Sequence, residues 1–280
     1  MKSLPIALQL YSVRDELGAD FEGTLKKVKE MGYDGVEFAG LCDKSFDEIK
    51  NICDNIGLSC VSVHISLDEV SANPDMIIDG YKSLGCKQIT VPYLPEGVRP
   101  GEGGFDKTVA AMTAVGKKCK EKDMFFAYHN HDFEFVKVGD EYGLDVLYNT
   151  ISSDLLICQL DTCWVNVGGV NPSEYIRKYA GRMYTVHLKD FVGQKTDNMY
   201  GLIGLKEDDG SGVKVEEFDF RPVGYGVQNF PEILKASVEA GAQWVVVEQD
   251  RPSLGKTPLE CAQMSVEYLK SLRVSDILKE

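Results

Sequence analysis

Five residues that can bind metals or move protons stand at the ends of separate apolar runs: Glu37, His64, Asp161, His187 and Glu248. Each run is short, as expected of a buried strand. Because side chains alternate between the two faces of a strand, each of these residues has one defined side. If the strands are parallel neighbours, the carboxylates and imidazoles meet at one end of the sheet, as in a barrel active site.

The predicted metal ligands are Glu134, Asp161, His187 and Glu248, which lie at or just beyond different strand ends. Three carboxylates and one imidazole form a hard, oxygen-rich set that suits one Mn²⁺, Mg²⁺ or Co²⁺ ion, with Zn²⁺ also compatible. Such an ion would polarise a substrate carbonyl and stabilise the enediolate formed when the adjacent C–H loses its proton. Glu134 and Glu248 are the predicted catalytic pair, because one carboxylate can remove a proton and a second can return it.

Other polar residues near strand ends are predicted to bind substrate. Lys189 shares a face with His187, so its ammonium can neutralise an oxyanion or form a salt bridge to a neighbouring acid. His129 and His131 also share a face, so one can pack inside a barrel while the other reaches substrate. Trp164 can stack on a sugar ring or serve as packing. The predicted substrate-binding residues are Glu37, His64, His131, Trp164 and Lys189.

Strand patterns alternate with helix patterns along the whole chain, which favours a parallel sheet. Eight strand–helix units can be distinguished, and no G-x-G-x-x-G follows the first strand. We therefore expect an α/β fold with a single (β/α)8 barrel over residues 1–280. The predicted strands are Ile6–Tyr11, Gly35–Phe38, Ser59–His64, Gln88–Val91, Phe125–His131, Leu156–Asp161, Met183–Leu188 and Trp244–Glu248. A long excursion, at about 191–226, separates the seventh strand from its helix, as expected for a lid or binding segment.

Composition excludes several classes of protein. The formal net charge is −14, with no basic cluster to bind phosphate backbones, so no nucleic-acid partner is expected. No apolar run approaches the ~20 residues needed to span a bilayer, so no membrane partner is expected. The eight cysteines contain no C-x-x-C pair, and no secretory signal is evident, which together favour a cytoplasmic location.

The chain resembles the sugar phosphate isomerase/epimerase family of xylose-isomerase-like TIM barrels, and the likeness runs essentially from end to end. It is carried by motifs such as Leu8–Asp15, Gly32–Glu37, Tyr128–Phe135, Val186–Asp190 and Val247–Gln249. The resemblance implies a divalent metal on a Glu–Asp–His–Glu set, which maps onto Glu134, Asp161, His187 and Glu248. In ketose epimerases of the family the first ligand stands within the fifth strand, where this chain has Tyr128. The resemblance therefore leaves either Glu134 or His131 for that position, and it also suggests a homodimer.

Several functions follow from these residues. The leading interpretation is a metal-dependent isomerase or epimerase of a sugar or keto-sugar derivative, with a small-molecule carbohydrate as its partner. A lyase or dehydratase acting on an oxidised sugar or glycoside, similar to inosose dehydratase, would use the same enediolate. An apurinic-site endonuclease would need more histidine ligands and a basic groove. A metal-free carbohydrate-binding barrel is the remaining alternative.

Overall fold

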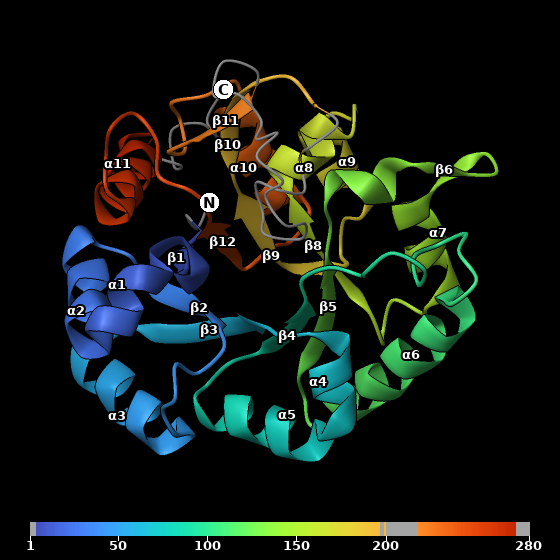
Figure 1. Cartoon of the computed structure of the whole chain (residues 1–280), viewed down its shortest axis with the longest axis horizontal. Coiled ribbons are helices and arrows are strands. Elements are labelled where there is room, and N and C mark those ends of the chain that lie inside the picture. Colours follow the sequence, from blue (N-terminus) through green and yellow to red (C-terminus); the bar gives the residue numbers. More distant parts are fainter. Residues whose placement is uncertain (1–3, 197–198, 200–217, 273–280) are drawn as a thin grey trace.

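Eight parallel strands form a closed barrel in this computed structural model, which describes residues 4–196, 199 and 218–272. Their order around the barrel is β1-β12-β9-β8-β5-β4-β3-β2, and β2 pairs in turn with β1. Figure 1 shows these strands at the centre of the molecule, inside a ring of helices. The predicted (β/α)8 barrel is therefore confirmed. The barrel strands are β1 (Ile6–Gln9), β2 (Gly35–Ala39), β3 (Ser59–His64), β4 (Gln88–Val91), β5 (Phe125–His129), β8 (Ile157–Asp161), β9 (Met183–Leu188) and β12 (Trp244–Val247).

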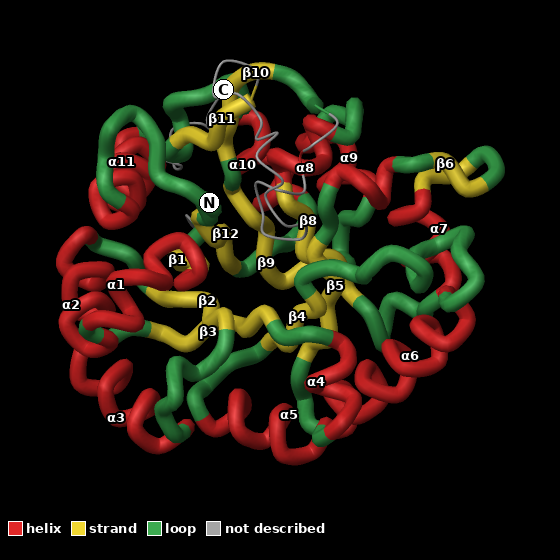
Figure 2. Tube along the Cα trace, in the orientation of Figure 1, coloured by secondary structure: helices red, strands yellow, loops and turns green. Residues whose placement is uncertain are grey.

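Many of the helices begin at polar capping residues and several end at glycine, as the sequence signals. Ser45 and Thr257 form capping boxes, and Gly32 and Gly57 end their helices in the left-handed conformation that glycine adopts without strain. Figure 2 shows the resulting alternation of strand and helix along the trace. Among the described residues, no helix is both long enough and apolar enough to cross a membrane. The helices are α1 (Arg14–Ala19), α2 (Phe21–Met31), α3 (Phe46–Ile56), α4 (Leu67–Ala72), α5 (Pro74–Ser83), α6 (Phe105–Glu121), α7 (Gly143–Thr150), α8 (Thr162–Val167), α9 (Pro172–Lys178), α10 (Phe230–Glu239) and α11 (Pro258–Ser271).

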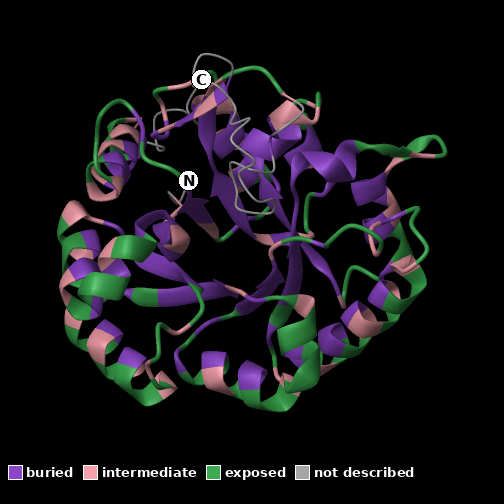
Figure 3. Ribbon diagram, viewed as in Figure 1, coloured by how far each residue is buried: buried purple, intermediate pink, exposed green. Residues whose placement is uncertain are grey.

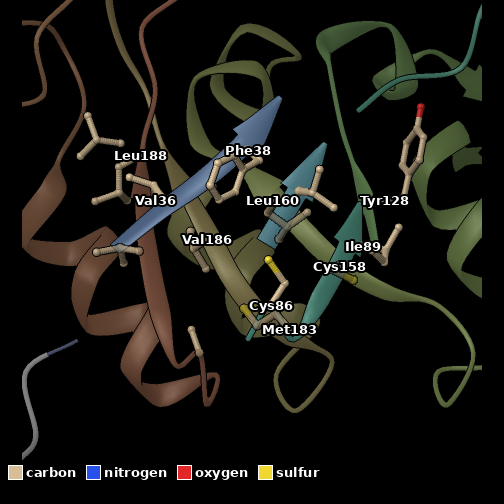
Figure 4. Close-up of a cluster of buried hydrophobic side chains, with 14 of the residues drawn as sticks. Val36, Phe38, Cys86, Ile89, Tyr128, Cys158, Leu160, Met183, Val186 and Leu188 are labelled. Carbon is tan, nitrogen blue, oxygen red and sulfur yellow. The ribbon is translucent and has the colours of Figure 1, made fainter. Parts of the chain in front are cut away.

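The hydrophobic core lies between the barrel and its helices. Alternate strand residues such as Val36, Phe38, Leu160 and Val186 are at most 1% exposed and form the cluster drawn in Figure 4. Figure 3 shows buried strands at the centre and helices whose exposed sides face outward. The intervening residues of the same strands point into the barrel and include many polar side chains. The period of two therefore separates a packing face from a polar interior.

Two strands end two residues earlier than the sequence patterns predict. β1 stops at Gln9, whose side chain accepts the backbone N–H of Tyr11 and starts the 3-10 helix η1 (Leu10–Val13). β5 stops at His129 and is followed by the 3-10 helix η2 (Asp132–Phe135). In both cases a side chain binds a backbone N–H and turns the chain out of the strand. A short antiparallel pair, β6 (Lys137–Val138) and β7 (Glu141–Tyr142), then follows η2.

The excursion after β9 contains an antiparallel pair, formed by β10 (Asp190–Gly193) near its start and β11 (Phe218–Arg221) near its end. Residues 197–198 and 200–217 of the predicted excursion lie outside the described residues. The carboxylate of Asp190 anchors this segment, because it accepts four backbone N–H groups. These come from Phe191 (2.9 Å), Gly224 (3.0 Å), Gly226 (2.8 Å) and Gln228 (3.2 Å).

We expect Asp190→Asn to lower the free energy of unfolding by about 2–3 kcal/mol, because the amide NH2 would face backbone donors that it cannot accept from. Equilibrium unfolding in urea measures this loss. Asp140→Asn, in the exposed turn between β6 and β7, is a matched control expected to stay within about 0.5 kcal/mol of wild type. Equal stability of the two variants would contradict the anchoring role of Asp190.

Candidate active site

Four residues from neighbouring strands meet at the C-terminal end of the barrel: His129, Asp161, His187 and Glu248. Each offers a ligand atom, and these atoms all lie within 4.8 Å of one another. His129 and Asp161 end β5 and β8, His187 pairs in register with Asp161, and Glu248 directly follows β12. All four are buried. Three of the four predicted metal ligands are thus brought together, with His129 as the fourth member of the group. We call these four residues the acidic-histidine group.

The ammonium of Lys189 lies against this group, and Lys189 as a whole is 1% exposed. It is 3.1 Å from Glu248 Oε2, 2.9 Å from Asp250 Oδ2 and 3.7 Å from Asp161 Oδ2. Three carboxylates therefore face one ammonium. This leaves an excess of acid, which a bound cation would balance.

Burial and charge set different protonation states in the group. Burial lowers the pKa of His129 well below its ordinary value, so the ring is neutral and keeps a lone pair. Burial also opposes charge on His187, but Glu37 and Glu248 raise the pKa of His187 to about 10. Burial disfavours the ionised form of Glu248, yet Lys189 and His187 hold the pKa of Glu248 well below its usual range. A neutral imidazole and an ionised carboxylate thus lie side by side.

A pocket of about 470 Å³ opens onto the group. His64, His131 and Lys189, three of the predicted substrate-binding residues, line it together with Glu248. The Nδ1 atom of His131 is buried and has no hydrogen-bond partner among the described residues, so it is available to a ligand. Tyr11 and Tyr93 add aromatic surface. The remaining lining residues are Ala39, Gly40, Ile65, Ser66, Glu69, Tyr81, Pro92, His129 and Asp250.

Glu134 lies apart from the acidic-histidine group and from the lining of this pocket. Its carboxylate accepts the hydroxyl of Tyr128 and the backbone N–H of His131 (2.7 Å). Burial raises the pKa of Glu134 to about 8. The geometry therefore does not favour the predicted metal-ligand and catalytic roles of Glu134. The reason is that β5 ends at His129, so that His129 faces the barrel interior while η2 carries Glu134 back onto Tyr128.

Two predicted substrate contacts also lie outside the pocket lining. Glu37 is 0% exposed, and both of its carboxylate oxygens are occupied by donors inside the barrel. Trp164 is 0% exposed and packs against Phe218 and Phe220 in a separate hydrophobic cluster. Glu37 is therefore placed inside the barrel, and the position of Trp164 fits packing, which was the alternative to stacking on a sugar ring.

Sequence reasoning missed Asp250 and gave no role to Gln159. Asp250 lines the pocket and forms a salt bridge with Lys189. It lies two residues beyond Glu248, so continuing the strand alternation past the end of β12 would have predicted that both residues share a face. Gln159 contacts Glu37, His64 and His129. Because Gln159 lies two residues before Asp161, the sequence predicts that both side chains share one face of the strand. The sequence does not predict which residues Gln159 contacts.

The acidic-histidine group fits a divalent cation. The Oδ2 atom of Asp161 is buried without a hydrogen-bond partner, which is costly unless a ligand uses it. Two carboxylates and two imidazoles suit Zn²⁺, Mn²⁺ or Co²⁺. His64 forms an overlapping set with His129 and His187, but the Nε2 atoms of His64 and His187 both contact Glu37.

Known proteins with curated names resemble this chain at modest identity. An inosose dehydratase from Geobacillus kaustophilus is 23% identical over 280 residues, covering 89% of this chain and 86% of that protein. One from Clostridium beijerinckii is 29% identical over 165 residues. That match covers 57% of this chain and spans about half (51%) of the Clostridium protein.

Solved structures resemble the fold over almost the whole chain. A sugar phosphate isomerase/epimerase from Parabacteroides distasonis has a TM-score of 0.77 and 21% identity, and the match covers 100% of this chain and 96% of that one. A zinc-bound IOLI protein has a TM-score of 0.72 and 18% identity, with 99% of this chain and 100% of that one covered. The family model described as "Xylose isomerase-like TIM barrel" matches residues 25–272. This chain belongs to the xylose isomerase-like TIM barrel family.

Proposed function

We propose that this chain is a divalent-metal-dependent enzyme that removes the proton next to a carbonyl of a sugar or keto-sugar derivative, and that it is an isomerase or epimerase. The observation that carries the proposal is the acidic-histidine group at the floor of a ligand-sized pocket. The zinc-bound structural relative and the isomerase/epimerase relative support it as analogies of fold.

The proposed metal ligands are His129, Asp161, His187 and Glu248. When bound, the ion would act as a Lewis acid on the substrate carbonyl. Glu248 is the proposed base, since its carboxylate is ionised and faces the pocket. The Lys189 ammonium would offset negative charge that develops on the substrate oxygen, and His64 and His131 would bind its hydroxyls.

The number of carboxylates at the pocket distinguishes the possible reactions. Inversion of a carbon needs a second acid–base group on the opposite face, and Glu134, the predicted partner, lies outside the pocket lining. Asp250 is held by Lys189 at 2.9 Å, and Glu69 belongs to α4. A proton shift to the neighbouring carbon needs only one base, so isomerisation fits these residues better than epimerisation.

A lyase is the second candidate, and the inosose dehydratases that match 89% of this chain favour it. Elimination begins with the same proton removal, and the Lys189 ammonium at the pocket lining would then donate a proton to the departing group. Mass spectrometry of products from a panel of ketoses, keto-inositols and keto-glycosides separates the two. Isomerisation leaves the mass unchanged, whereas elimination removes water or an aglycone.

We expect protein purified without chelators or a histidine tag to contain near-stoichiometric Mn, Co, Zn or Mg, and a Glu248→Gln, His187→Ala double variant to lose it. Elemental mass spectrometry measures this content. Metal added to stripped wild type at 100 times its dissociation constant should stabilise the fold by about 2.7 kcal/mol. Metal-free wild type with no thermal shift would refute the proposal and leave a carbohydrate-binding barrel.

His129 and Glu134 can be compared directly as the ligand from the β5 region. We expect His129→Ala to weaken Zn²⁺ binding at least tenfold, because it removes a neutral donor from the group. Glu134→Gln should bind Zn²⁺ as wild type does, because its carboxylate contacts Tyr128 instead. Competition with a chromogenic chelator gives both affinities, and circular dichroism checks the fold. The opposite order of affinities would restore Glu134 as the ligand.

A further inference from the structure

Several side-chain donors inside the barrel contact the carboxylate of Glu37. Glu37 lies in the middle of β2 and is fully buried. Its Oε1 atom contacts Gln9 Nε2 (2.6 Å), His187 Nε2 (2.7 Å) and His64 Nε2 (3.0 Å). Its Oε2 atom accepts Ser62 Oγ (2.5 Å) and Gln159 Nε2 (2.6 Å). These donors hold the carboxylate in one orientation.

The two ring nitrogens of His187 contact two different carboxylates. Nε2 lies 2.7 Å from Glu37 Oε1, whereas Nδ1 lies 3.2 Å from Glu248 Oε2. Glu248 lines the pocket and belongs to the acidic-histidine group, while Glu37 does neither. A histidine that ligates a metal through one nitrogen commonly donates its other N–H to a carboxylate, which fixes the ring tautomer.

We propose that Glu37 is a positioning residue for the metal site. It accepts the Nε2–H of His187 and thereby leaves Nδ1 as the nitrogen that binds a divalent cation beside Asp161, Glu248 and His129. This inference rests on the proposed function, and it adds a residue that does not touch substrate or metal.

A carboxylate suits this position for a chemical reason. It only accepts hydrogen bonds, and its two oxygens offer about four lone-pair sites, so several donors can converge on it. A glutamine side chain of similar size would turn an NH2 group toward at least one of these donors. His187 would then lose the charged acceptor that selects its tautomer, or one of the glutamines would lose its partner.

The first test compares Zn²⁺ affinity in wild type, Glu37→Gln and Ser62→Ala by competition with a chromogenic chelator. Ser62→Ala is the matched control, because it removes one donor from Glu37 Oε2 and leaves the contact with His187 intact. We expect Glu37→Gln to bind Zn²⁺ about 10–100-fold more weakly and Ser62→Ala to bind close to wild type. Equal binding by wild type and Glu37→Gln overturns the inference but leaves the proposed function standing. A wild type that binds no Zn²⁺ overturns both.

The second test reads the tautomer of His187 and needs no variant of Glu37. Zinc-loaded wild type labelled with ¹⁵N-histidine is observed by NMR, with the His187 signals assigned by their loss in His187→Gln. We expect a proton on Nε2 and a metal shift on Nδ1. A proton on Nδ1 with zinc on Nε2 overturns the inference, even if Glu37→Gln fails to fold. A purely structural role for Glu37 would not fix this tautomer.

Discussion

The interior of this barrel depends on the cost of burying charge. A buried carboxylate is costly unless its lone pairs accept hydrogen bonds, and Glu37 accepts them from donors on β1, β3, β8 and β9. Gln159 extends the same network, because its Oε1 atom contacts His64 (2.6 Å) and His129 Nδ1 (3.3 Å). Donation of the His129 Nδ1–H to Gln159 directs Nε2 toward Asp161. Two histidines of the acidic-histidine group are therefore oriented by partners that lie outside it.

Lys189 lies at the start of the excursion after β9, and its buried ammonium is subject to the same cost of burying charge. The ammonium lies among Asp161, Glu248 and Asp250, and these acids raise its pKa well above the ordinary value although burial opposes its charge. The carboxylate of the next residue, Asp190, accepts the backbone N–H of Phe191 in β10 and that of Gly226 in the loop after β11. The β10–β11 pair, which packs beside α8, therefore also fixes the backbone next to Lys189. Lys189 offsets part of the negative charge, and the remaining excess matches a site for a divalent ion.

Strand alternation made much of the fold and three members of the group predictable, because a period of two fixes which side chains face the interior. Asp161, His187 and Glu248 follow from that period once the strands are parallel. The choice between His129 and Glu134 does not follow, because it depends on where β5 stops. That end is set by the contacts of Glu134 with Tyr128 and the His131 backbone, a local loop geometry that periodicity does not encode. The depth of Glu37 and the packing of Trp164 likewise depend on tertiary partners from distant elements.

The fold alone does not select the reaction, since barrels of one family support different chemistries through their loops. The reactions open to this pocket depend on which of its side chains can accept or donate a proton. Glu248 is an ionised carboxylate, and the side chains with nitrogen atoms at the lining are those of His64, His129, His131 and Lys189. One base beside a polarised carbonyl serves both a proton shift and an elimination. The two diverge only at the next step, when the electron pair either takes a proton at the adjacent carbon or expels a group β to the carbonyl. That difference belongs to the substrate, because a molecule with no leaving group at the β carbon can undergo only the first.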